Sequence, residues 1–179
     1  MTLRRAEIEQ TLAESRLKTL AAYLAMDKSA LTAPLTPSEH DPNSSWSALD
    51  HLSHLGYIEE TFVAMIRRHL AGEANPVALL VDTAGATRTR EEIMADVHAR
   101  TEADRVRSRP EQLGDVIRRT GAARAATLAL LAELSDEQLD ERLPGAPWAD
   151  GTIGGVLATN AHHATMHWTW MKDAAAASS

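Results

Sequence analysis

Two histidines near the end of the chain have a spacing that suits metal binding. His163 and His167 are four residues apart. If this segment is helical, both imidazoles lie on one face of the helix, with Cβ atoms about 5–6 Å apart. Two ligands from one helix make a weak site, so a third must come from elsewhere, and His54 is the best candidate. Three histidines with an open position for water or substrate would resemble catalytic zinc.

The spacing alone leaves a second interpretation open, because a core histidine is more often hydrogen-bonded than metal-bound. A buried pair favours a metal ion or another group that contacts both rings, because the free-energy cost of burying two imidazoles is larger than that of burying one. His51 lies one turn before His54 and is the alternative third ligand. We expect His54 to point toward the core and His51 to lie on the same side of the helix but nearer to solvent.

Polar residues near these histidines could orient them, because a metal-bound imidazole usually donates its second N–H to an acceptor. Asp50 and Asn160 each lie about one turn before a candidate ligand, and Glu59 lies about a turn and a half after His54. Glu59 also has an interpretation as a surface carboxylate, whereas Asn160 shares the apolar stripe of the last helix. Candidates for an apolar pocket wall are Trp46, Trp168 and Trp170.

Four long segments with helical periodicity must position these side chains. They span about 3–27, 44–71, 108–134 and 152 onward, and a polar helix is expected over 90–107. N-cap candidates are Ser44 or Ser45, Ser108, Ser135 and Thr152. Proline-rich 31–43 is expected to be a loop, and no strand pattern is visible. The pattern predicts an all-α four-helix bundle, whose sites form between facing helices.

Composition narrows the function further. With 179 residues and 44% apolar content, the chain is expected to form one domain over 1–179. The absence of cysteine excludes disulfides, thiolate nucleophiles and cysteine-ligated metal sites. A net charge of −7 argues against nucleic-acid binding. The charged N-terminus and the lack of ~20 consecutive apolar residues predict a soluble, cytoplasmic protein without a membrane partner.

Several motifs in order along the whole chain resemble the DinB/YfiT-like superfamily, which includes mycothiol-dependent maleylpyruvate isomerases and bacillithiol S-transferases. They are Trp46-Ser followed by His54-Leu and Glu59, Leu128–Leu139, and Gly151-Thr-Ile followed by His163-x-x-x-His167. The resemblance implies a bundle with a long crossover between main helices two and three, frequent homodimers, and a divalent metal held by His54, His163 and His167. The chain departs from the family in Trp168-Thr169-Trp170, which replaces a small glycine-glutamine ending and places bulk beside the open coordination position.

These observations favour a metal-dependent enzyme of small-molecule metabolism or detoxification. All-nitrogen ligation suits zinc first and nickel second. The resemblance favours a thiol S-transferase or isomerase that uses a low-molecular-weight thiol as cosubstrate. A hydrolase at the same metal, and a non-catalytic metal- or ligand-binding stress protein, remain the alternatives. No serine–histidine–aspartate order, phosphate loop or dinucleotide fingerprint indicates another chemistry.

Overall fold

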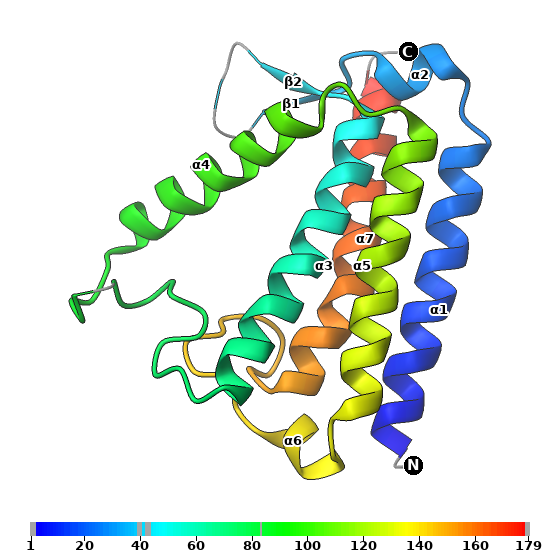
Figure 1. Cartoon of the computed structure of the whole chain (residues 1–179). Coiled ribbons are helices and arrows are strands. Elements are labelled where there is room, and N and C mark those ends of the chain that lie inside the picture. Colours follow the sequence, from blue (N-terminus) through cyan, green and yellow to red (C-terminus); the bar gives the residue numbers. More distant parts are fainter. Residues whose placement is uncertain (1–2, 39–40, 42–43, 83, 178–179) are drawn as a thin grey trace.

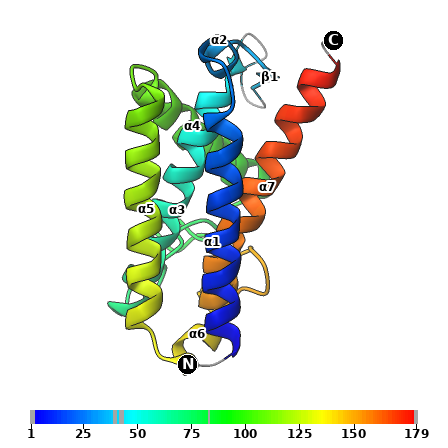
Figure 2. The same ribbon diagram turned by 90° about the vertical axis from the view of Figure 1, so that its right-hand side faces the viewer.

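Four long helices form the body of the protein in the computed structural model (Figure 1), which describes residues 3–38, 41, 44–82 and 84–177. They are α1 (Leu3–Leu24), α3 (Ala48–Leu70), α5 (Leu113–Glu133) and α7 (Ile153–Ala177). Helix α3 packs against α5 and α7, and α1 packs mainly against α7. In Figure 2, α1 and α5 lie on the near side of the bundle, and the C-terminal half of α7 leans away from α1. The predicted all-α bundle is confirmed.

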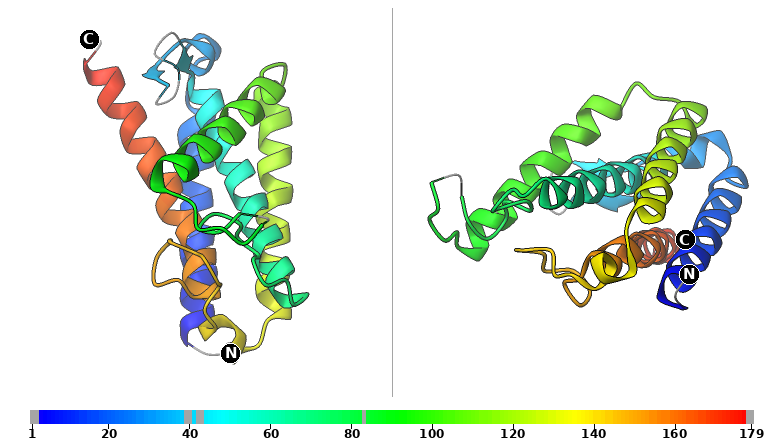
Figure 3. Two further views of the ribbon diagram at one scale, coloured as in Figure 1. Left: turned by 90° about the vertical axis from the view of Figure 1, so that its left-hand side faces the viewer. Right: turned by 60° about the horizontal axis from the view of Figure 1, so that its bottom comes forward.

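The connection between α3 and α5 is long and contains a helix of its own, α4 (Arg90–Ser108). Figure 3 shows α4 running obliquely across the outer side of α3, at a steep angle to the bundle. Thr89 caps α4 by accepting a hydrogen bond from the backbone N–H of Glu92, whose carboxylate bonds back to Thr89. The predicted long crossover between the second and third main helices is therefore confirmed, and α4 adds a wall outside the bundle.

Two short strands contradict the expectation that the chain has none. Strands β1 (Thr36–Pro37) and β2 (Ser45–Trp46) pair antiparallel, with Thr36 opposite Trp46. Two-residue strands leave no periodic pattern in a sequence, which explains why the proline-rich segment looked like a loop only. The hairpin and the five-residue helix α2 (Lys28–Thr32) lie at the end of the bundle where α3 begins (Figure 1).

Two of the four expected helix starts differ from the structure. The N-cap of α3 is Ser47 rather than Ser44 or Ser45, and its hydroxyl accepts from the backbone N–H of Asp50. Helix α5 begins after Gln112, whereas Ser108 is the last residue of α4. The remaining two are confirmed: Ser135 caps α6 (Asp136–Asp140), and the Thr152 hydroxyl accepts from the third residue of α7. Each error arose where several polar residues competed for one cap.

The buried apolar side chains form two clusters along the bundle axis. The larger lies toward the end of the bundle where α1 and α7 begin, and it includes Leu12, Ile66 and Leu157. The smaller lies beneath the hairpin and includes Leu52 and Met171. On α1, Tyr23 is 1% exposed while Leu24 is 63% exposed, so the buried face of this helix ends on the tyrosine. The candidate metal centre lies on the outer side of this frame, where α3 and α7 face α4.

Candidate metal centre

Three histidines from two helices converge between α3 and α7. His54 comes from α3, and His163 and His167 come from consecutive turns of α7. Each offers one ring nitrogen, and these three atoms lie within 4.8 Å of one another. The Nε2 atoms of His163 and His167 are 2.9 Å apart. The structure therefore brings together the three residues that the sequence selected, and this histidine triad could hold a metal ion.

Burial keeps the triad in the form that binds metals. Desolvation lowers the pKa of His54 to about 3, with a further lowering by the nearby His163 and His51. Desolvation likewise lowers the pKa of His163 to about 4 and depresses that of His167 more strongly. Imidazoles with such low pKa values are neutral at physiological pH, and the neutral ring offers a lone pair to a metal.

One nitrogen of the triad is buried without a hydrogen-bond partner, and two others are separated by a distance that suits two ligands of one ion. The Nδ1 atom of His54 is buried and has no hydrogen-bond partner among the described residues. A buried polar nitrogen without a partner is costly. Zinc–nitrogen bonds of about 2.0–2.1 Å in a tetrahedral shell place neighbouring nitrogens about 3.3 Å apart, close to the observed His163–His167 separation. The donor set, its neutrality and its spacing fit a borderline divalent cation.

His51 lies inside the protein, which contradicts its expected position near solvent. Its side chain is 3% exposed, its Nδ1 atom lies 2.7 Å from Nδ1 of His167, and its Nε2 atom lies 2.8 Å from Oγ1 of Thr36. Helix α7 and strand β1 both contact the side of α3 that carries His51, so this side chain is shielded from water. The spacing of three residues between His51 and His54 was the signal in the sequence for a shared face.

Two of the three expected tryptophans line the site. The ring centroid of Trp46 is 5.1 Å from that of His51 and 5.3 Å from that of His54, and Trp170 is 4.8 Å from His167. Trp168 instead packs on Tyr23, with centroids 5.8 Å apart, beside the smaller core cluster. Positions 168 and 170 differ by about 200° around a helix, so they face opposite sides.

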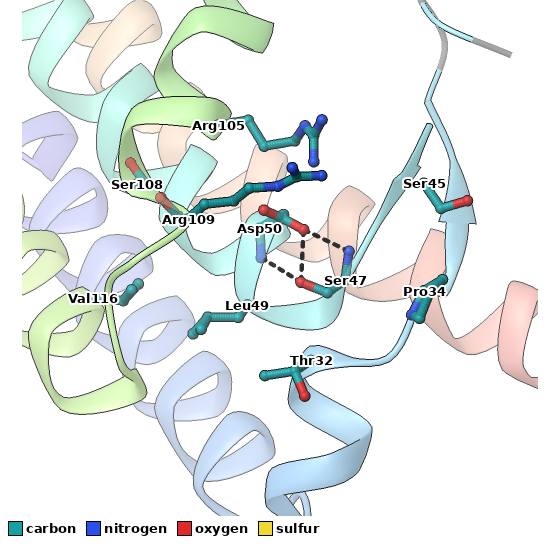
Figure 4. A pocket seen from close by; sticks show the side chains of 11 residues that line it. Thr32, Pro34, Ser45, Ser47, Leu49, Asp50, Arg105, Ser108, Arg109 and Val116 are labelled. Atoms are coloured by element: carbon teal, nitrogen blue, oxygen red, sulfur yellow. Dashed lines mark hydrogen bonds between the residues drawn. The ribbon is translucent and has the colours of Figure 1, made fainter. Parts of the chain in front are cut away.

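The three polar residues expected to orient the ligands have other partners. Asp50 closes the N-cap of α3: its carboxylate accepts from the backbone N–H and the hydroxyl of Ser47 (Figure 4). Glu59 pairs with Arg124 of α5. Asn160 is buried beside that ion pair, and its Nδ2 atom has no hydrogen-bond partner among the described residues. No hydrogen bond between these three side chains and the triad is found within the described part of the chain.

A cavity of about 530 Å³ opens onto the triad. It lies between α3, α7 and α4, and the loop before α7 closes one side. Its lining residues are Thr36, Pro37, Trp46, His51, His54, Ile58, Phe62, Met94, Val97, His98, Thr101, Trp148, Thr159, His163, His167, Trp170, Asp173 and Ala174. Most of this wall is apolar or aromatic, which is typical of a pocket that binds a small organic molecule.

A second hollow, of about 220 Å³, lies beside the first turn of α3 and is drawn in Figure 4. Arg105 of α4 and Arg109, which follows the last residue of α4, line it together with Ser47 and Asp50. Arg105 is already bonded to Glu102 and Ser44, and Asp50 to Ser47. Because Arg105, Ser47 and Asp50 already have hydrogen-bond partners within the protein, this hollow offers less to a ligand than the cavity at the triad.

Comparison with known proteins agrees with the histidine geometry. A model of the DinB superfamily matches residues 11–171. The chain belongs to the DinB superfamily. No curated protein and no solved structure matches it. Membership and the triad together are in keeping with a metal-binding protein. Among the described residues of this DinB-superfamily chain, no helix is both long and apolar enough to span a membrane.

Proposed function

We propose that this protein is a metal-dependent enzyme acting on small molecules, in which His54, His163 and His167 hold one divalent ion. The observation that carries the proposal is the position of the triad on the wall of a largely apolar cavity of about 530 Å³. A structural metal site is normally closed by four protein ligands, whereas this one has three and faces a space that a substrate could fill. Zinc is the proposed ion, and nickel is the next candidate.

The residues around the triad define what the site could do. A bound divalent ion would lower the pKa of a thiol or water molecule that shares its shell. His54, His163 and His167 would hold the ion as neutral ligands. Trp46 and Trp170 flank the histidines and limit the access of water, which strengthens electrostatic effects at the site.

The proposed reaction is thiol S-transfer or thiol-dependent isomerisation. A neutral three-nitrogen site keeps the full charge of a divalent ion available for an anionic thiolate. The apolar wall formed by Phe62, Val97 and Trp148 suits the hydrophobic part of an electrophilic substrate. Hydrolysis by a water molecule at the same ion uses the same residues and is the second candidate. A protein that binds and sequesters a ligand without catalysis is the third.

Cobalt substitution separates these functions. We expect small thiols such as mycothiol or bacillithiol to change the visible absorption of the cobalt protein through sulfur–metal charge transfer. The change should disappear in His163→Ala, and turnover of electrophilic substrates should require the thiol. If no thiol alters the spectrum but a test ester or amide is hydrolysed in a metal-dependent reaction, the hydrolase is favoured. If neither occurs, catalysis is contradicted and the binding protein is favoured.

A homodimer is also proposed, on the grounds that relatives commonly pair and that α1 carries unburied leucines. Leu17 and Leu24 are 70% and 63% exposed. They are seven residues apart and therefore share one face of α1. A second copy of the chain packed on this face would cover both side chains.

A further inference from the structure

A chain of three polar contacts leads from the hairpin to the histidine triad. Oγ1 of Thr36 on β1 lies 2.8 Å from Nε2 of His51. Nδ1 of His51 lies 2.7 Å from Nδ1 of His167. Nε2 of His167, on the other side of its ring, lies 2.9 Å from Nε2 of His163. The ring of His167 is therefore in contact with His51 through Nδ1 and with His163 through Nε2, and the ring of His51 is in contact with Thr36 through its own Nε2.

The protonation states along this chain follow from the pairing. If His167 binds a metal through Nε2, its Nδ1 atom carries the hydrogen, because a neutral imidazole has one N–H. That N–H can donate only to a bare Nδ1 of His51. His51 must then carry its own hydrogen on Nε2, and this N–H donates to Oγ1 of Thr36. Each nitrogen has one role, so the arrangement selects a single tautomer for both rings.

We propose that His51 is a positioning residue of the metal centre, which fixes the tautomer and ring orientation of His167 and is itself oriented by Thr36. The inference rests on the proposed metal site and adds a residue to it. An acceptor on the second nitrogen of a ligating histidine is the usual means of orienting such a ligand. Here a second histidine supplies that acceptor, in place of the expected Asp50, Glu59 or Asn160.

The geometry distinguishes this role from that of a fourth ligand. Nδ1 of His51 faces Nδ1 of His167, which lies on the opposite edge of the ring from the Nε2 atom that faces His163. An ion shared by the triad therefore lies away from His51. Trp46 packs on His51 with centroids 5.1 Å apart and restricts the movement of its ring.

The hairpin acquires a function from this arrangement. Thr36 and Trp46 are opposite one another in the β1–β2 ladder, and both contact His51. Strand β1 also contacts α7. The pairing of two very short strands thus places a hydroxyl and an indole ring around one imidazole, and this gives His51 a defined orientation.

Three variants test the proposal through zinc affinity, measured by competition with a chelator at one fixed pH. His51→Phe keeps a ring of similar bulk but removes the acceptor, and we expect zinc binding to weaken about 10–100-fold. In His51→Asn the side-chain oxygen can occupy the position of Nδ1, so binding should be tighter than in His51→Phe. Thr36→Val should weaken binding less, and should add nothing in the double variant with His51→Phe, because Thr36 acts through His51.

His69→Phe is the matched control, because it makes the same substitution near the far end of α3 and should leave zinc affinity unchanged. Circular dichroism of each variant checks that the helices are intact. In the zinc-loaded wild-type protein, long-range ¹H–¹⁵N spectra should show His51 protonated at Nε2 and bare at Nδ1. Because this measurement uses the wild-type protein, its result does not depend on whether any variant folds.

Three results would overturn the proposal: equal zinc affinity in His51→Phe and wild type, a hydrogen on Nδ1 of His51, or retained zinc in His54→Ala together with complete loss in His51→Phe. The last result would make His51 a ligand. Zinc binding that responds as expected, in a protein without thiol chemistry or hydrolysis, would contradict the proposed enzyme and leave the role of His51 intact. The two inferences therefore fail separately.

Discussion

The carboxylate of Glu59 and the guanidinium of Arg124 form a buried ion pair between α3 and α5, with Nη2 and Oε2 3.3 Å apart. Arg124 also donates to the backbone carbonyl of Leu12 and so joins α1 to the pair. Glu59 lies about 140° around α3 from His54. Glu59 is one of three residues that the sequence suggested as supports of the metal site, and its ion pair instead holds three helices together.

Removal of Arg124 should therefore weaken the fold rather than the site. Arg124→Met leaves the carboxylate of Glu59 buried without its partner, and we expect the free energy of unfolding to fall by about 3–5 kcal/mol. Urea denaturation measures this loss. Arg67→Met is the matched control, because it breaks an exposed α3–α5 pair with Glu133 and should change stability little. Zinc affinity should stay unchanged in both variants, and a large loss in Arg124→Met would connect Glu59 to the metal site.

The histidine triad should bind about one divalent ion per chain. His54→Ala, His163→Ala and His167→Ala should each lower metal affinity markedly, because each leaves only two ligands. Elemental analysis of tag-free protein and titration of the three variants measure stoichiometry and affinity. His162→Ala is the control, since it alters an exposed imidazole beside His163 on the same helix. Unchanged binding in all three ligand variants would remove the hypothesis.

Removal of the metal should lower stability without unfolding the bundle. The two apolar clusters are built from other residues, so the metal-free protein should keep its helical circular dichroism. Zinc at a hundred times its dissociation constant should stabilise the folded state by about 2.7 kcal/mol. Thermal unfolding with and without a chelator measures the difference, and His167→Ala should show none. Loss of helical signal on chelation alone would contradict this separation of fold and site.

Close contact between α3 and α5 at Gly56 predicts a steric effect. A Cβ atom added to Gly56 would lie 2.8 Å from Cγ2 and 3.3 Å from Cα of Thr120. The helices must then move apart, and Gly56→Ala should destabilise the protein by about 1–3 kcal/mol. Gly114→Ala, near the start of α5, meets no atom closer than 3.7 Å and should be neutral or slightly stabilising. Equal urea midpoints for the two variants would contradict the tight packing.

The proposed homodimer can be tested by its mass in solution. Light scattering at micromolar concentration should give twice the 19.4 kDa of one chain. The double variant Leu17→Glu and Leu24→Glu places two charges on the exposed face of α1 and should yield monomers with unchanged circular dichroism. A wild-type protein that scatters as a monomer would contradict pairing. A dimer that survives the double variant would place the interface on another face.

Features that depend on neighbours along the chain could be predicted from the sequence. Helical periodicity identified the four long helices and α4, because an amphipathic stripe repeats with each turn. The spacing of His163 and His167 determined that both rings share a face of α7, since four residues make about one turn. His54 was predicted as the third ligand because it lies in a second helix and because the sequence resembles the DinB group.

Tertiary contacts decided the rest, because they join segments far apart in the chain. The partner of Glu59 is on α5, and the partners of His51 are on β1 and α7. None of these partners is a neighbour in sequence. Without them, Glu59 was interpreted as a support of His54, and His51 was expected to lie near solvent. Trp168 and Trp170 are the same residue type, and only the packing of α7 shows that Trp168 contacts Tyr23 beside the smaller apolar cluster while Trp170 lines the cavity. Local spacing determined which histidines could act together, whereas the packing of α7 and the hairpin on α3 determined what surrounds them.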